Sequence, residues 1–189
     1  MTSLSRENER ILEVIWESAK PLTTKEASEK IGLGLRPTNM RLINLRKAGL
    51  VAQSGGGYTI TAEGKARIGF PRIDEENSGK ILRRISPEKA FHFYAGIDQS
   101  LGSSADHLTD LCDKIRSINI KSIEFHTARG DFESWIRQLG DIELEKRLRL
   151  IRETGLKGEA LRERLYGALR SRCDELERKT PEGHTRRTS

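Results

Sequence analysis

The sequence lacks the features that mark membrane, secreted and disulfide-rich proteins. No apolar run approaches the roughly 18 to 20 residues that span a bilayer, and no basic, apolar and small-residue signal opens the chain. Cys112 and Cys173 are the only cysteines, and both lie among apolar residues at helical spacing rather than in a paired motif. We therefore exclude membrane and secretory proteins and a disulfide-stapled fold, and we expect a cytoplasmic protein in a reducing compartment.

Closely spaced metal ligands are also absent. The histidines, His92, His107, His126 and His184, lie far apart, and neither a Cys-x-x-Cys nor a His-x-x-x-His motif occurs. Metal sites that can be recognised from sequence usually draw their ligands from such spacings. We therefore expect no metal site and no cofactor.

Acidic side chains are missing from one long stretch near the front of the chain. Residues 30–62 contain no Asp or Glu, whereas Arg36, Arg41, Arg46 and Lys47 all fall within them. The whole chain carries 34 basic and 28 acidic residues, a net charge of +6. A one-sided basic stretch of this kind is typical of a surface that binds a polyanion such as nucleic acid.

Length and composition favour two small domains. At 189 residues, 35% hydrophobic and 33% charged, the chain is polar for one compact globule. Most of the basic excess lies at the front, where residues 1–70 hold 11 basic and 7 acidic side chains. We expect a first domain over 1–70, a linker over 71–85, a helical domain over 86–180 and a disordered tail over 181–189.

Caps and glycines divide the first domain into helices and a hairpin. Thr23 and Glu26 have the spacing of a capping box, Pro37 suits the first turn of a third helix, and Gly49 is expected to end that helix. Alternating residues around the glycine-rich turn at 54–57 predict a β-hairpin, which a short fourth helix follows.

This order of elements, with a basic third helix, resembles the winged helix-turn-helix family of DNA-binding domains. Two blocks carry the resemblance: Leu-x-x-Leu-x-x-x-Gly-Leu-Val at 42–51 and Tyr-x-Ile-Thr-x-x-Gly at 58–64. The resemblance covers residues 5–68. It implies a domain that places its third helix in the major groove of DNA and lays the hairpin, or wing, along the backbone or minor groove.

Helical spacing assigns the side chains of the third helix to two faces. Steps of about 100° per residue from Thr38 place Leu42, Leu45 and Gly49 on the buried face. Cationic and amide side chains on the other face suit guanine edges, adenine edges and phosphates. The predicted DNA-binding residues are Arg36, Asn39, Met40, Arg41, Ile43, Asn44, Arg46 and Lys47 on the helix and Gln53, Ser54 and Tyr58 on the wing.

Met40 and Ile43 support an alternative to DNA binding. Two apolar side chains on an exposed helix face could touch thymine methyl groups. They could equally pack against another protein, which would make this domain a protein-binding module without a nucleic-acid role.

The second domain carries a second resemblance. Phe-His-Phe-Tyr at 91–94 and the run 124–140, followed by Asp141 and Leu144, resemble a small helical module of uncharacterised archaeal proteins. The resemblance implies a fold unit and an archaeal source, and no reaction. Helical spacing predicts helices at 108–118, 120–127 and 131–139, one that begins after Asp141, and one at 158–179.

Polar residues of the second domain could form a pocket. His92, His126, Arg129, Asp131 and Trp135 offer an acid, a base and a cation, which a ligand pocket or an enzyme centred on His126, Arg129 and Asp131 would need. A structural role is the alternative, because Asp131 can cap a helix and Trp135 can anchor a core. No Ser-His-Asp order, phosphate loop or paired-carboxylate motif occurs, so we predict no catalytic residue and no enzyme.

The last predicted helix carries an apolar stripe that suits a homodimer. Charged residues, among them Arg172 and Glu175, flank this stripe. An exposed stripe would pair with a second copy, although packing within the chain explains it equally well. The stripe consists of Leu161, Leu165, Leu169, Cys173 and Leu176.

Together these patterns predict a mainly α fold with a small β-hairpin, in which an N-terminal winged helix precedes a C-terminal α-helical domain. We predict a sequence-specific transcriptional regulator that binds double-stranded DNA as a homodimer, with half-sites about one helical turn apart. The second domain would serve dimerisation or the sensing of a small-molecule effector, whose identity the sequence leaves open.

Overall fold

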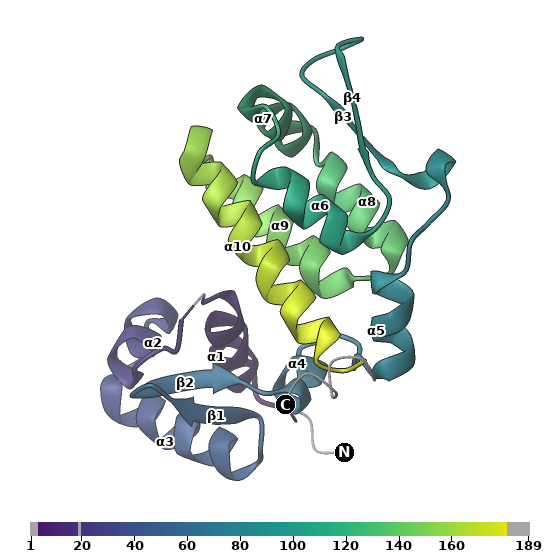
Figure 1. Ribbon diagram of the computed structural model, residues 1–189. Helices are drawn as coiled ribbons and strands as arrows, with labels where there is room; N and C mark the ends of the chain where they lie inside the picture. Colours follow the sequence, from purple (N-terminus) through teal and green to yellow (C-terminus); the bar gives the residue numbers. More distant parts are fainter. Residues whose placement is uncertain (1–3, 19, 181–189) are drawn as a thin grey trace. The chain divides into compact units, whose positions relative to one another are not determined.

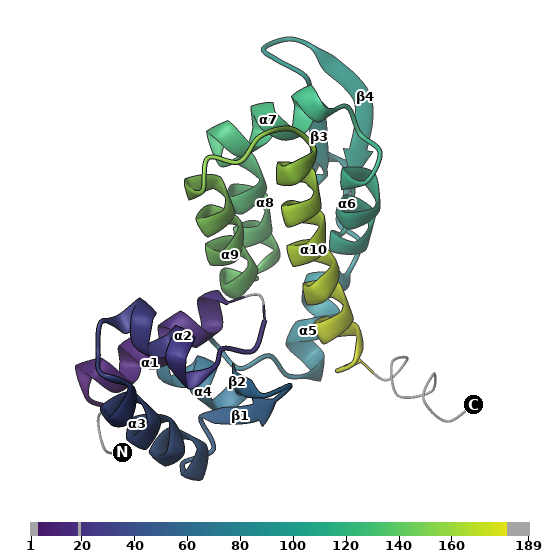
Figure 2. The ribbon, with the colours of Figure 1, turned by 90° about the vertical axis from the view of Figure 1, so that its left-hand side faces the viewer.

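The computed structural model describes residues 4–18 and 20–180 and divides the chain into two compact units, Met1–Arg72 and Ile73–Ser189. The described residues form ten α-helices, one 3-10 helix and two two-stranded antiparallel sheets, so the fold is mainly helical (Figures 1 and 2). None of these described helices is long and apolar enough to cross a membrane. The predicted disordered tail, 181–189, lies outside the described residues.

The first unit consists of four helices and one hairpin. The predicted capping box is confirmed, because Thr23 Oγ1 accepts from the Glu26 N–H at 3.2 Å and the Glu26 carboxylate accepts from the Thr23 N–H at 2.9 Å. Gly49 follows the third helix with a φ of 73°, as expected for a residue that ends a helix. The elements are α1 (Arg6–Glu17), α2 (Thr24–Ile31), α3 (Leu35–Lys47), β1 (Val51–Ser54), β2 (Gly57–Ile60) and α4 (Ala62–Arg67).

The hairpin of the first unit is fixed to the helices by backbone pairing as well as by a shared core. Leu22, between α1 and α2, exchanges hydrogen bonds of 3.0 and 2.7 Å with Tyr58 of β2, so a one-residue bridge lies beside the sheet. Gly57 is required here, since a Cβ at this position would lie 2.8 Å from the backbone carbonyl of Leu22. The core combines residues from the helices and the hairpin: Ile11, Leu12, Val14, Ile15, Leu22, Ala27, Leu42, Leu45, Leu50, Val51 and Tyr58.

The second unit is a helical bundle with one hairpin. Asp141 caps α9 as predicted, because its Oδ1 accepts from the Leu144 N–H at 3.0 Å. The hairpin extends past α7 in both views (Figures 1 and 2). The elements are α5 (Glu75–Leu82), the 3-10 helix η1 (Pro87–Lys89), β3 (Phe91–Tyr94), β4 (Ser100–Ala105), α6 (Leu108–Ile115), α7 (Ile120–Arg129), α8 (Asp131–Leu139), α9 (Ile142–Glu153) and α10 (Gly158–Glu177).

The predicted linker over 71–85 is wrong in its central part, which forms α5. Asp74 caps this helix, since its Oδ1 accepts from the Asn77 N–H at 2.8 Å. Ser78 and Ile81 are buried, and Ile81 belongs to the core of the second unit. A polar segment therefore becomes helical because a cap starts it and one buried face holds it to the bundle.

The expectation of a purely helical second domain is also wrong, because residues 91–94 form a strand. Phe91 and Phe93 are buried, whereas His92 and Tyr94 are exposed. This alternation has the period of two that a strand with one covered face requires. β3 pairs with β4 in antiparallel register, with Phe91 opposite Ala105 and an irregularity between His92 and Tyr94.

The apolar stripe of α10 is buried within the second unit. Leu161, Leu165, Leu169, Cys173 and Leu176 are each at most 2% exposed and belong to its core. α10 packs against α5, α6, α7 and α9 (Figures 1 and 2). Packing within the chain thus accounts for the stripe, which is not free to pair with a second copy. Cys112 and Cys173 are both buried free thiols in the same core.

Candidate functional site

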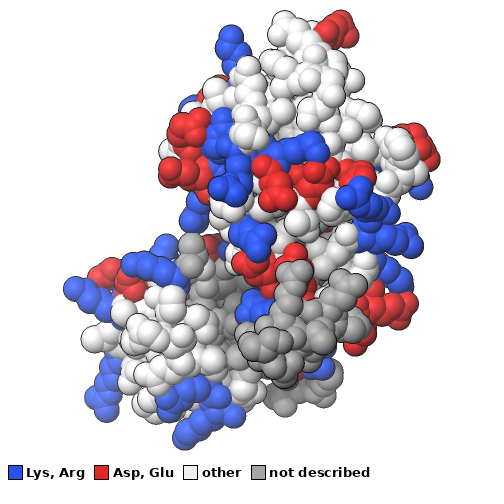
Figure 3. All heavy atoms as spheres, in the orientation of Figure 1, with Lys and Arg blue, Asp and Glu red and all other residues white. Residues whose placement is uncertain are grey.

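The surface of α3 that faces away from the core carries basic, amide and apolar side chains. Thr38, Leu42 and Leu45 are buried, as helical spacing predicted, whereas Gly49 is exposed. Figure 3 shows Lys and Arg at the lower edge of the view, where α3 lies. The predicted contact residues left exposed on this helix are Arg36, Asn39, Met40, Asn44, Arg46 and Lys47, and Arg41 and Ile43 are partly buried.

Two arginines of α3 are bound to neighbouring parts of the first unit. Arg41 donates through Nη1 to Asn8 Oδ1 at 3.2 Å and to Ser5 Oγ at 3.4 Å, so its side chain lies against the start of α1. Arg46 donates to Gln53 Oε1 at 2.7 Å and links α3 to the wing. Both side chains therefore help to orient α3 within the unit. The other two cations of α3, Arg36 and Lys47, have no partner among the described residues.

The wing offers fewer contacts than the sequence suggested. Gln53 and Ser54 are exposed, and Gly55 and Gly56 form the tip with φ values of 55° and 78°. Tyr58, by contrast, is buried in the core of the first unit. Its assignment to DNA is corrected, because the bridge to Leu22 turns this part of β2 toward the helices.

A pocket of about 390 Å³ lies in the second unit. All five residues that the sequence suggested for a pocket line it. The walls come from β3, the turn after it, α7 and α8. The lining residues are Ala90, Phe91, His92, Tyr94, Gly96, Ile97, Asp98, Phe125, His126, Arg129, Asp131 and Trp135.

His126 connects β3 to the junction of α7 and α8. Its Nε2 accepts from the backbone N–H of Tyr94 at 2.9 Å, and its Nδ1 lies 2.8 Å from Asp131 Oδ2. Because Nε2 is an acceptor, the proton of the neutral ring belongs on Nδ1, which donates to the carboxylate. Arg129 Nε donates to the same oxygen at 3.1 Å. Both ring nitrogens of His126 therefore serve to hold the pocket wall together.

Aromatic packing keeps His126 neutral. The ring lies 4.8 Å from Phe91, 5.2 Å from Phe125 and 5.7 Å from Phe132, measured between centroids. Burial lowers the pKa of His126 below its ordinary value of 6.5, and the hydrogen bond and charge of Asp131 oppose this shift only in part. The side chain is thus uncharged near neutral pH, as a structural hydrogen-bonding group requires.

The second unit is expected to lose stability as the pH falls below about 6.5, because unfolding releases His126 to take up a proton. The loss ends once the pH is below the lowered pKa of the folded state. His126→Gln can keep both hydrogen bonds without titrating, and should remove this pH dependence. Urea unfolding followed by Trp135 fluorescence, in a Trp16→Phe background, measures it. Equal pH dependence with and without His126 would contradict the assignment.

One cluster of side chains in the described part of the chain has the spacing of a metal site. It consists of Asp106, His107 and Asp110, whose possible ligand atoms lie within 4.8 Å of one another. Arg84 and Lys114 already form ion pairs with the two carboxylates. Asp110 Oδ2 also accepts from the Asp106 N–H at 3.3 Å, at the start of α6. These contacts favour a structural role at the start of α6, because a metal ion would have to displace two cations.

A buried ion-pair network joins the start of α9 to the end of α10. Arg172, which is 5% exposed, donates to both carboxylate oxygens of the fully buried Asp141 at 2.7 and 2.9 Å. Its Nη1 also donates to Glu143 at 2.9 Å and to Glu175 at 2.8 Å. Burial opposes the charge of Arg172, but these carboxylates outweigh it and raise the pKa of the guanidinium.

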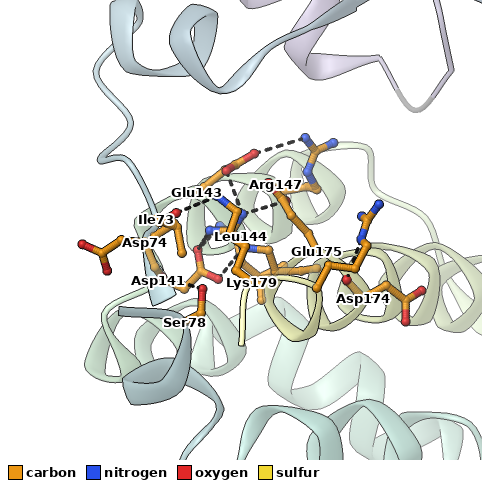
Figure 4. Close-up of polar contacts among 12 residues, drawn as sticks. Ile73, Asp74, Ser78, Asp141, Glu143, Leu144, Arg147, Asp174, Glu175 and Lys179 are labelled. Atoms are coloured by element: carbon orange, nitrogen blue, oxygen red, sulfur yellow. Dashed lines mark hydrogen bonds and ion pairs between the residues drawn. The ribbon is translucent and has the colours of Figure 1, made fainter. Parts of the chain in front are cut away.

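The same end of the bundle holds further polar contacts. Arg147 lies 4.0 Å from Glu143, and Lys179 Nζ donates to the carbonyl of Ile73 at 2.6 Å (Figure 4). The sequence patterns did not indicate this network, and they placed Arg172 only as a charged residue flanking the apolar stripe. Asp141 precedes Arg172 by 31 positions, so no local pattern could pair them.

Comparison with known proteins finds a match for the second unit. Residues 72–170 match a family of unknown function (DUF5752), which is slightly more than half of the chain. No curated protein and no solved structure matches. The matched part includes every residue that lines the pocket, whereas the first unit lies almost wholly outside it.

Proposed function

Since the chain belongs to a family of unknown function (DUF5752), we propose its function from its own side chains: a DNA-binding regulator that contacts double-stranded DNA through its first unit. The observation that carries the proposal is the exposed face of α3. It presents two cations and two amides, Arg36, Lys47, Asn39 and Asn44, inside a stretch without acidic residues.

The topology of the first unit supports a winged-helix arrangement. The order is α1, the bridge residue Leu22, α2, α3 and the β1–β2 hairpin, with Arg46 bonded across to Gln53. A helix of this diameter fits the major groove, which is about 12 Å wide. The hairpin would then lie beside the helix with Ser54 and the glycine tip toward the phosphates, to which backbone N–H groups can donate.

Each exposed polar residue of α3 has a role that its chemistry suggests. Arg36 suits a bidentate contact with a guanine edge, and Asn39 and Asn44 suit adenine. Lys47 suits a phosphate, where a cation releases condensed counterions. Met40 and the partly buried Ile43 can contact thymine methyl groups. Arg41 and Arg46 would act mainly by fixing the orientation of α3, because both are bound within the unit.

The proposal is tested by binding of the full chain to a pool of random-sequence duplexes across a salt series, with the retained sequences read out. We expect binding that weakens steeply with salt and enriches one motif. Lys47→Gln should reduce the slope of log K against log salt by about 1, and Arg36→Ala should relax the preference at one base pair.

Lys121→Gln is the matched control, because Lys121 is an exposed lysine of α7 in the second unit. It removes the same charge and should leave both the slope and the motif unchanged. Negligible binding at low salt, or equal losses for Lys47→Gln and Lys121→Gln, would overturn the proposal.

A second candidate is a protein-binding function of the same helix. Leu35 and Met40, on the same helix, are 56% and 54% exposed and offer apolar area to a protein partner. Replacing both by glutamine should weaken a protein interface strongly and DNA binding only slightly. A double variant that keeps full DNA affinity would therefore separate the two functions.

The protein could bind DNA as a homodimer, but two copies would have to associate through a surface other than the buried stripe of α10. Two copies on one duplex would make operator half-sites recur about one helical turn apart. Sedimentation of the full chain, with and without the selected duplex, measures the number of copies.

A further inference from the structure

The pocket of the second unit has rigid aromatic walls. Phe91 stacks on Phe132 with centroids 4.9 Å apart and meets the edge of Trp135 at 5.9 Å. The indole of Trp135 is held in turn by a 2.9 Å hydrogen bond from Nε1 to the carbonyl of Lys89. These rings cannot turn away without breaking the core, so the apolar part of the pocket is formed before any ligand arrives.

Arg129 supplies one cation at the edge of this pocket. Its guanidinium lies 5.2 Å above the ring of Phe125, and its Nε donates to Asp131. These two contacts hold the group in position although the side chain is 56% exposed. Its terminal Nη nitrogens have no partner among the described residues. They form a fixed, open fork of the kind that binds a carboxylate through two parallel hydrogen bonds.

The other charges of the pocket limit which anion can bind. The Asp131 carboxylate is already engaged by His126 and Arg129, whereas Asp98 is an exposed carboxylate of the turn after β3. Arg129 is the only lysine or arginine among the lining residues. One cation in a lining that also holds the Asp98 and Asp131 carboxylates favours a singly charged anion over a phosphate ester, which carries nearly two charges.

We infer that this pocket binds a small monocarboxylic acid with an aromatic ring, its carboxylate on Arg129 and its ring between Phe91, Phe125 and Trp135. The volume of about 390 Å³ lies at the lower end of the range for small-molecule sites, which suits one ring system. The inference concerns the second unit and is independent of DNA binding by the first.

Two pairs of probes test the inference on the full chain by titration calorimetry. Phenylacetate and indole-3-acetate carry the carboxylate, and phenylacetamide and indole-3-acetamide have the same shape without the charge. We expect the acids to bind at least about tenfold more tightly than the amides, because the charge-assisted bonds to Arg129 are lost in the amides. In a Trp16→Phe background, quenching of Trp135 fluorescence should accompany binding of phenylacetate.

Arg129→Gln should reduce the affinity for the acids to that for the amides. Arg116→Gln is the matched control, because Arg116 lies in the same unit, 5.4 Å above the ring of Tyr166, and does not line the pocket. It should leave both affinities unchanged.

Three results would overturn the inference. They are equal binding of acids and amides, binding of inorganic phosphate as tightly as the acids, and no binding of any probe at about 10 mM, which is weaker than useful recognition. The comparison of acids with amides needs no variant, so it decides the question even if Arg129→Gln folds poorly.

Discussion

Replacing Arg172 by methionine is expected to lower the free energy of unfolding of the second unit by about 3 to 5 kcal/mol. Methionine keeps the apolar stem of the side chain but removes the charge that holds Asp141, Glu143 and Glu175 together. Asp141 is fully buried and loses the donor to both of its carboxylate oxygens. The cost arises because the buried Asp141 carboxylate is left without its cation, rather than from lost packing volume.

Arg170→Met is the matched control for this prediction. Arg170 lies on the same helix and pairs with Asp174 at 2.8 Å, but both side chains are nearly half exposed. Such a pair contributes about 0 to 1 kcal/mol, since water screens it. Amide hydrogen exchange of α9 and α10 under increasing urea measures both variants. Adding Asp141→Asn and Glu143→Gln to Arg172→Met should restore part of the loss, and no recovery would contradict the electrostatic explanation.

Gly64→Ala is expected to destabilise the first unit by about 3 kcal/mol or more, at the upper end for overpacked sites. A Cβ on Gly64 would lie 2.1 Å from the carbonyl oxygen of Leu50 and 2.7 Å from Ile60 Cγ1. The Leu50 oxygen is itself fixed, because it accepts from the Thr61 N–H at 3.1 Å. Neither the backbone nor the hairpin can yield, so α4 would be forced away from the sheet.

Gly167→Ala provides the control, because Gly167 also lies in a helix but has no atom within 4 Å of an added Cβ. Alanine there should stabilise α10 by about 0.5 to 1 kcal/mol through its higher helix propensity. In Gly64→Ala, amides of the first unit should exchange faster and the proposed DNA binding should be lost, while amides of the second unit stay protected. If the amides of α1 and α3 kept their protection in Gly64→Ala, the predicted clash with the Leu50 carbonyl oxygen would not determine the stability of the first unit.

The helices and their ends could largely be predicted because their signals are local. Thr23 and Glu26 are three positions apart, and Asp141 bonds to the N–H of Leu144 three positions later. The buried face of α3 follows from the helical repeat alone. The same holds for most of the pocket, since His126, Arg129, Asp131 and Trp135 fall within ten positions of one another and the α7–α8 turn at Gly130 gathers them.

The predictions that failed depended on which neighbour covers a segment. Residues 91–94 form a strand because Phe91 packs on Phe132 and His126, which come much later in the chain. Residues 75–82 form a helix because Ile81 finds the core of the bundle. Tyr58 is turned inward by its pairing with Leu22, which no pattern within the hairpin could indicate.

The sequence by itself determined where helices begin and end, which face of α3 is apolar, and that basic residues gather there without acidic ones, because these properties depend on neighbours a few positions apart. Only the tertiary structure decided which charges are free. It bound Arg41 and Arg46 within the first unit, left Arg129 with an open fork beside a pocket, and buried Arg172 between carboxylates. The physical reason is that the burial and pairing of a charge depend on groups brought together from distant parts of the chain.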